Sequence, residues 1–188
     1  MRPEPRIVKD FLSPHDYAVL HKYLNSKDKS ELNWSDSFGR FHLSNDSTLD
    51  NLSNQLLPIA RKIFNSPTLL PSYTLCSIYE TPKAQLWKHK DDNACTYTLD
   101  MCVWAKTPWD LYVDGKPYTL GGNEALAYYG NDQEHWREAF PDPENNEVAM
   151  IFFHYVEPDH WYFTHGPQYL EVIRAQAQAG GKIGRAHV

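Results

Sequence analysis

Hydrophobic residues near the start of the chain recur at the spacing of an α-helix. Tyr17, Leu20 and Leu24 fall on one stripe of such a helix. Ser13 precedes the run and is followed directly by a proline and, three positions on, by an acidic residue, a pattern typical of a helix start. The pattern therefore predicts a helix that begins after Ser13 and ends at about Asn25.

A second helical pattern covers residues 47–65. Its apolar side chains share one face, and they are Leu49, Leu52, Leu56, Ile59, Ile63 and Phe64. Pro58 lies inside this run, and a proline in a helix interior costs about 3 kcal/mol. We therefore expect a kink or a break at this proline.

From residue 71 onward the pattern changes to short runs rich in β-branched and aromatic residues, separated by turn residues. These runs cover residues 73–79, 95–105, 110–113, 123–129 and 148–156. Asp114 and Gly115 lie between two β-like runs and predict a tight hairpin. The chain is thus predicted to be mainly β, a sandwich or barrel backed by N-terminal helices.

The length of 188 residues favours a single domain. We expect this domain to cover residues 1–178, with helical support over 1–70 and a β core over 71–156. A final helix is predicted from Pro167 to about Gln178, and residues 179–188 are expected to form a flexible tail.

Composition narrows the class of protein. With 18 Lys and Arg against 24 Asp and Glu, the formal charge is −6, which makes a nucleic-acid partner unlikely. The three cysteines show no C-x-x-C spacing, so neither a disulfide scaffold nor a thiolate zinc site is indicated, and a reducing cytoplasm is expected. No apolar run is long enough to suggest a signal peptide or a membrane span.

The most informative chemistry is a pair of residues near the middle of the chain. His89 and Asp91 are two positions apart, so both can face the same side at the end of a strand. His135, from a distant strand, would complete a set of two imidazoles and one carboxylate. This set leaves three metal positions open, which suits Fe(II) with a chelating cosubstrate and oxygen. With nine histidines in the chain, the spacing alone is a weak signal.

At these residues the chain resembles the 2-oxoglutarate- and Fe(II)-dependent oxygenases, particularly the prolyl-hydroxylase-like branch. The resemblance covers residues 71–156 and extends weakly to residues 7–24. Residues 130–137 (GNDQEHWR), followed by residues 153–156 (FHYV), look like a subgroup of small bacterial and phage-type members.

The resemblance implies a double-stranded β-helix (jelly-roll) fold and three cofactors or cosubstrates: Fe(II), 2-oxoglutarate and O2. It also implies that His89, Asp91 and His135 are both the metal ligands and the catalytic centre. Most relatives carry a basic residue about ten positions after the second histidine, where it pairs with the distal carboxylate of 2-oxoglutarate. Here residues 144–147 read Glu-Asn-Asn-Glu, with no cation.

Arg137 is the candidate to bind that carboxylate, because it lies two residues after His135 and guanidinium suits bidentate carboxylate recognition. The alternative is that Arg137 forms a surface pair with Glu134 or Glu138. Lys88 and Lys106 are weaker candidates, since both can lie outside the sheet.

Tyr79 lies ten residues before His89, where prolyl-hydroxylase-like relatives often place a tyrosine that hydrogen-bonds the cosubstrate. The alternative is a core tyrosine on a strand. Asp100, in mid-strand, is expected at an edge or on a solvent face, and the alternative is that it lines the site. Arg40 is expected on a loop between the helices, with a surface role, and the alternative is contact with a substrate anion at the mouth of the pocket. His154, in the middle of an apolar strand, is not expected to be a ligand.

The resemblance implies a dioxygenase that hydroxylates a C–H bond of an amino-acid or peptidyl side chain, with decarboxylation of 2-oxoglutarate to succinate. Its partners would be that small-molecule cosubstrate and an unidentified amino-acid, peptide or protein substrate. Two alternatives remain open. One is a non-catalytic jelly-roll protein that binds metal or ligand, motivated by the missing downstream cation. The other is a zinc hydrolase that uses the same ligands with an activated water.

Overall fold

The computed structural model describes residues 2–164. The predicted C-terminal helix from Pro167 and the predicted tail lie outside these residues. The described helices are α1 (Pro14–Asn25), α2 (Ser47–Gln55) and α3 (Leu57–Phe64), with short 3-10 helices η1 (Lys29–Glu31) and η2 (Asn93–Cys95). None of them has the length and apolar character needed to cross a bilayer.

The strands form two antiparallel sheets that face each other. The larger sheet has the order β1 (Arg6–Val8), β9 (Glu124–Tyr128), β6 (Tyr97–Ala105), β11 (Val148–Val156), β4 (Leu70–Tyr79), β3 (Arg40–Ser44) and β2 (Asn33–Ser35). The smaller sheet has the order β5 (Leu86–His89), β10 (His135–Arg137), β7 (Leu111–Val113) and β8 (Lys116–Tyr118). From β4 to β11 the chain crosses repeatedly between the sheets, which is the double winding of a jelly roll.

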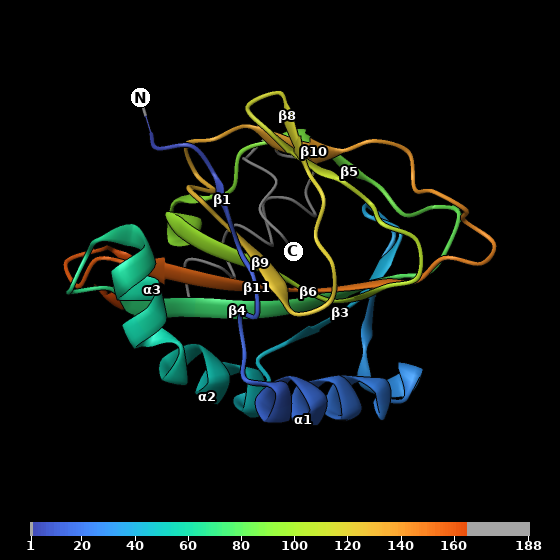
Figure 1. The fold of residues 1–188 in the computed structure, drawn as a ribbon, viewed down its shortest axis with the longest axis horizontal. Helices are drawn as coiled ribbons and strands as arrows, with labels where there is room; N and C mark the ends of the chain where they lie inside the picture. The colour runs from blue at the N-terminus through green and yellow to red at the C-terminus, as the bar shows by residue number, and fades with distance from the viewer. Residues whose placement is uncertain (1, 165–188) are drawn as a thin grey trace.

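The larger sheet is covered on both faces. Figure 1 shows α1 and α2 against the face that points away from the smaller sheet. One apolar cluster packs between that face and the helices and includes Leu20, Leu49 and Ile151. A second cluster fills the space between the sheets and includes Leu126 and Phe152. Strand β11 is buried at every position because it is central and has no solvent-facing side.

The two helix predictions that fall within the described residues are confirmed. In α1 the Ser13 side chain accepts a hydrogen bond from the backbone N–H of Asp16, as an N-cap residue does. The expected break also occurs, because α2 ends at Gln55 and α3 begins at Leu57. Pro58 therefore occupies the first turn of α3, where its missing N–H costs no helical hydrogen bond.

The hairpin at Asp114 and Gly115 is also confirmed. It joins β7 to β8, and both residues have positive φ, 48° and 83°. Positive φ at both central positions is what a type I′ turn requires.

One stretch between the helices differs from the prediction. Strands β2 and β3 extend the larger sheet beside β4, where the sequence reasoning expected a loop. The expectation that Arg40 lies on the surface is wrong, since Arg40 is the first residue of β3 and has no exposed area. Strand β3 is only five residues long, so its alternation is a weak local signal, and its pairing with β4 decides its position.

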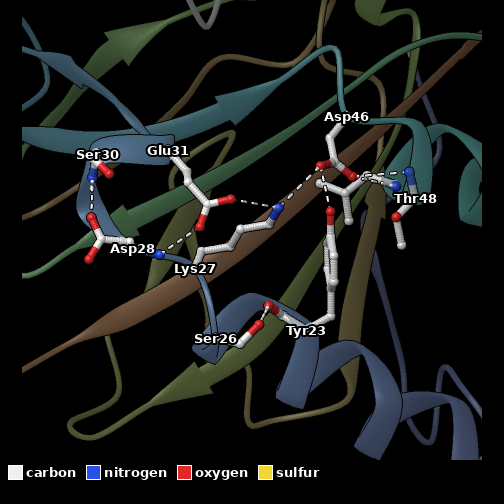
Figure 2. Close-up of polar contacts among 9 residues, drawn as sticks. Tyr23, Ser26, Lys27, Asp28, Ser30, Glu31, Asp46 and Thr48 are labelled. Carbon is white, nitrogen blue, oxygen red and sulfur yellow. Dashed lines mark hydrogen bonds and ion pairs between the residues drawn. The ribbon is translucent and has the colours of Figure 1, made fainter.

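A polar network connects the end of α1 to the start of α2, on the face of the larger sheet that the helices cover (Figure 2). Asp46 caps α2 by accepting hydrogen bonds from the backbone N–H groups of Thr48 and Leu49. Its second oxygen accepts a hydrogen bond from the Tyr23 hydroxyl at 2.6 Å and lies 3.9 Å from the Lys27 ammonium. One carboxylate therefore serves as both a helix cap and a link between two helices.

Candidate metal centre

The two histidines of the predicted ligand set face each other across neighbouring strands. His89 is the last residue of β5 and His135 is the first residue of β10, and the two are direct partners in the antiparallel register. Their ring centroids are 4.3 Å apart. The pairing of β5 with β10 is therefore what brings together two residues far apart in the sequence.

Asp91 lies in the segment that follows β5. Its backbone N–H donates to the carbonyl oxygen of Gly130 at 2.9 Å, which ties this segment to the one that precedes β10. Its Oδ1 atom is 3.3 Å from His89 Nε2 and 3.5 Å from His135 Nε2. The structure thus brings the three predicted ligands together, and one ligand atom from each lies within 4.8 Å of the others.

Both imidazoles are held in the orientation that a metal ligand needs. His135 Nδ1 is 2.9 Å from the carbonyl oxygen of Gln133, and His89 Nδ1 is 2.5 Å from that of Trp87. A carbonyl can only accept, so Nδ1 carries the proton and the Nε2 lone pair points toward Asp91. Backbone carbonyls commonly orient metal-binding histidines in this way. The donor set therefore fits a divalent metal ion.

Gly130 is required by the close packing behind Asp91. A Cβ atom at this position would lie 2.5 Å from Asp91 Oδ2 and 2.8 Å from the Cys95 carbonyl oxygen. Both distances are shorter than van der Waals contact, and the second involves backbone that cannot easily move. Only glycine allows the two segments to approach this closely.

Burial and charge act in opposite directions on His135. Burial favours the neutral imidazole, but the neighbouring Asp91 carboxylate favours the charged form, and the net effect raises the pKa of His135. Asp92, next in sequence, caps η2 by accepting from the backbone N–H of Ala94. Burial raises the pKa of Asp92 to about 6, and Asp92 is not one of the three converging ligands.

Arg137 is buried between the sheets. Its Nη2 atom lies 3.7 Å from Asp100 Oδ2, and its Nη1 donates to the carbonyl oxygen of Trp109. The alternative of a surface pair with Glu134 or Glu138 is not what the structure shows, since Glu134 pairs with Lys88.

The expectation for Asp100 is wrong. This residue lies in the middle of β6, which is flanked by β9 and β11, and only 1% of it is exposed. Burial raises the pKa of Asp100 to about 6, although the positive charge of Arg137 acts to lower it.

Arg40 is a second buried guanidinium that the sequence reasoning placed elsewhere. Its Nη1 donates to the Tyr79 hydroxyl at 2.6 Å. Its guanidinium carbon lies 4.4 Å from the Phe38 ring centroid and 6.0 Å from that of Phe152. Arg40 and Arg137 both favour the ionised form of Asp100, so both guanidinium groups lie near this carboxyl group in the space between the sheets.

The two lysines considered as weaker candidates lie outside. The Lys88 ammonium is 3.3 Å from a Glu134 oxygen, and the Lys106 ammonium is 3.4 Å from a Glu147 oxygen. Both side chains are more than half exposed. Neither cation lies in the space between the sheets.

No protein-family model and no curated protein sequence matches the chain. Solved structures do match its fold. HygX from Streptomyces hygroscopicus, with nickel, 2-oxoglutarate and hygromycin B bound, has a TM-score of 0.65 at 9% identity over 82% of this chain and 83% of that one. The non-heme α-ketoglutarate-dependent carbocyclase SnoK from nogalamycin biosynthesis has a TM-score of 0.67 at 10% identity over 82% and 80%.

A Pseudomonas putida prolyl-4-hydroxylase has a TM-score of 0.61 at 13% identity over 80% of this chain and 91% of that one. At these identities the likeness shows the fold, so the predicted jelly roll backed by helices is confirmed. Of these neighbours, SnoK is non-heme and α-ketoglutarate-dependent, and HygX holds 2-oxoglutarate, whereas membership of this chain in the prolyl-hydroxylase-like branch stays a prediction.

Proposed function

We propose that this protein is a 2-oxoglutarate- and Fe(II)-dependent dioxygenase. The observation that carries the proposal is the convergence of His89 Nε2, His135 Nε2 and Asp91 Oδ1 at the adjoining ends of β5 and β10. Three protein ligands leave open positions for a chelating cosubstrate and oxygen. The double-stranded β-helix of the structural neighbours is the scaffold on which such a site is built.

His89, Asp91 and His135 would hold the metal ion. When bound, Fe(II) together with 2-oxoglutarate and O2 supplies the oxidation of a substrate C–H bond, and 2-oxoglutarate becomes succinate and carbon dioxide. The protein orients the ligands through the two Nδ1 hydrogen bonds and keeps water away by burying the surrounding side chains.

The charge between the sheets supports a dianionic cosubstrate. Among the described residues, the buried Arg, Lys, Asp and Glu side chains are Arg40, Arg137, Asp91 and Asp100, two basic and two acidic groups. Their charges cancel, so a divalent metal ion alone would leave two positive charges in a region of low dielectric. Binding of 2-oxoglutarate, with two carboxylates, would restore neutrality.

Arg137 and Tyr79 are our candidates to bind the distal carboxylate of the cosubstrate, as the sequence suggests, and the structure adds Arg40. The Tyr79 hydroxyl already accepts from Arg40, so its own proton is directed elsewhere and can be donated to a carboxylate. Guanidinium groups recognise carboxylates through two parallel hydrogen bonds. No residue of the inward face of β11 supplies a cation, which leaves this role to β3 and β10.

We further propose that the reaction is hydroxylation of an amino-acid or peptidyl side chain. The support is the likeness to a prolyl-4-hydroxylase together with the complete two-histidine, one-carboxylate ligand set. The neighbours also include an epimerase and a carbocyclase, so the reaction type needs its own test.

The test is to add Fe(II) and 2-oxoglutarate to the full chain without oxygen. A visible metal-to-ligand charge-transfer band is expected, and it should be absent in Asp91→Ala. With oxygen, succinate should form in the presence of a panel of amino acids and peptides. Metal binding without any band at saturating 2-oxoglutarate would favour a non-catalytic binding protein. Hydrolytic turnover with stoichiometric Zn(II) would instead favour the zinc hydrolase.

A further inference from the structure

A third buried histidine has the same orientation as the two proposed iron ligands. His154 lies on β11, and its Nδ1 is 3.2 Å from the carbonyl oxygen of Tyr73 on the neighbouring strand β4. As in His89 and His135, the carbonyl fixes the proton on Nδ1 and leaves Nε2 as the donor atom.

Asp91 has two oxygens that face different neighbours. Oδ1 is the atom nearest to the imidazoles of His89 and His135. Oδ2 borders the narrow space above Gly130, which is also lined by the Cys95 carbonyl oxygen and by Thr98 Oγ1. The carboxylate therefore presents one oxygen to the proposed iron site and the other toward the segment that carries Cys95.

Cys95 supplies a sulfur atom to the same region. It ends η2 and is completely buried, and its Sγ lies 3.0 Å from the Tyr73 hydroxyl. If the sulfur loses its proton, this hydroxyl can donate a hydrogen bond to the thiolate. Asp91, Cys95 and His154 each offer one ligand atom within 4.8 Å of the others, and all three residues are buried.

We propose that Asp91, Cys95 and His154 form a second metal site that takes a thiophilic divalent cation such as Zn²⁺. Carboxylate oxygen, thiolate sulfur and imidazole nitrogen are all usual zinc ligands, and three of them leave one position for water. Binding forms a bond from the metal to sulfur and releases the thiol proton to solvent. This set contains a soft ligand, whereas the set of His89, Asp91 and His135 contains none.

The two sites compete because they share Asp91. Two divalent cations on one carboxylate would repel each other strongly in a buried region. Zn²⁺ on one side of the Asp91 carboxylate therefore weakens the binding of Fe(II) on the other. The consequence is inhibition by zinc that depends on Cys95, a residue outside the proposed iron ligand set.

The first experiment isolates the second site in a His135→Ala variant of the full chain. Titration with Co²⁺ alone should produce the near-ultraviolet thiolate-to-cobalt band. The band should disappear in His135→Ala with Cys95→Ser and remain in His135→Ala with Cys76→Ser. Cys76 is the matched control, since it is equally buried but packs on the helical face of the sheet. Circular dichroism confirms that each variant is folded, and His89→Ala replaces His135→Ala if the latter is not.

Either of two results would overturn the proposal: no band in a folded variant at saturating Co²⁺, or a band that persists without Cys95. The second experiment measures competition in the wild-type protein, in which Zn²⁺ should abolish the Fe(II) and 2-oxoglutarate band. Cys95→Ser should raise the Zn²⁺ concentration required by roughly ten-fold or more. An unchanged concentration would refute the competition. Because the cobalt band needs no cosubstrate, its outcome is independent of the proposed dioxygenase activity.

Discussion

The guanidinium of Arg137 and the carboxylate of Asp100 lie 3.7 Å apart in the buried space between the two sheets. The Asp100 oxygens and Arg137 Nη2 have no hydrogen-bond partner among the described residues, so the pair is close without being fully satisfied. Buried polar groups normally find partners, and a carboxylate of the cosubstrate would accept a hydrogen bond from Arg137 Nη2. The pair thus marks the region in which we place the distal end of the cosubstrate.

Removal of either buried guanidinium should weaken 2-oxoglutarate binding. Arg137→Ala and Arg40→Ala each remove a charged hydrogen-bond donor, and we expect the Kd of 2-oxoglutarate to rise roughly 10- to 100-fold. The measurement is titration of the Fe(II) charge-transfer band without oxygen. Lys106→Ala, which removes an exposed cation, is the control and should leave the Kd unchanged. If neither arginine variant alters the Kd, the proposed carboxylate site is wrong.

Asp100 should make the stability of the metal-free protein depend on pH. Its folded pKa, about 6, is above the ordinary 3.8, so the folded protein binds the proton more tightly than the unfolded chain does. The resulting stability is fully present below pH ~4 and is lost as the pH rises through about 6. In Asp100→Asn this loss is absent. The stability of the variant relative to wild type should therefore rise by about 3 kcal/mol between those limits.

Urea unfolding at a series of pH values measures this difference. The attraction between Arg137 and the Asp100 carboxylate is already contained in the pKa of Asp100, and an Asn side chain does not titrate, so the pH dependence from this position disappears in the variant. A parallel pH dependence in wild type and Asp100→Asn would show that the carboxyl group titrates normally.

Gly130→Ala should damage the metal centre more than the fold. The added Cβ would displace Asp91 or the Cys95 backbone, so metal affinity should fall by at least roughly ten-fold. Gly121→Ala is a matched control, because there a Cβ meets only the Glu124 side chain, at 3.6 Å or more. Isothermal titration with Fe(II) or Co²⁺ measures both variants. Equal affinities would show that Asp91 tolerates the crowding.

Asp46→Ala should reduce stability without affecting metal binding. It removes the cap of α2 and the hydrogen bond from Tyr23 seen in Figure 2, on the helical side of the larger sheet. We expect a loss of about 1–2 kcal/mol in the free energy of unfolding. Glu4→Ala, which breaks an exposed ion pair with Lys116, should leave the free energy of unfolding almost unchanged. A similar loss in both variants would contradict the structural role of Asp46.

Local features of this protein were predictable from the sequence because short-range physics decides them. The cap at Ser13, the break near Pro58 and the hairpin at Asp114 and Gly115 each follow from backbone preferences of a few adjacent residues. The jelly roll itself was predicted from the run of short strands together with the family resemblance.

Part of the candidate site was predictable as well. His89 and Asp91 are two positions apart, and at the end of a strand this local spacing points both side chains to the same side. The assignment of His135 as a ligand came from the family resemblance. In the structure, the pairing of β5 with β10 places His135 opposite His89.

Only the tertiary structure decided which charges are buried. Arg40 turns inward because β3 pairs with β4, and Asp100 is buried because β6 lies between β9 and β11. The partner strands are distant in sequence, and an arginine or aspartate at the same position in an edge strand would have remained in water. Whether a charged side chain is buried depends on the strands that cover it. Strands that pair across a long stretch of sequence leave no signal in the residues next to that side chain.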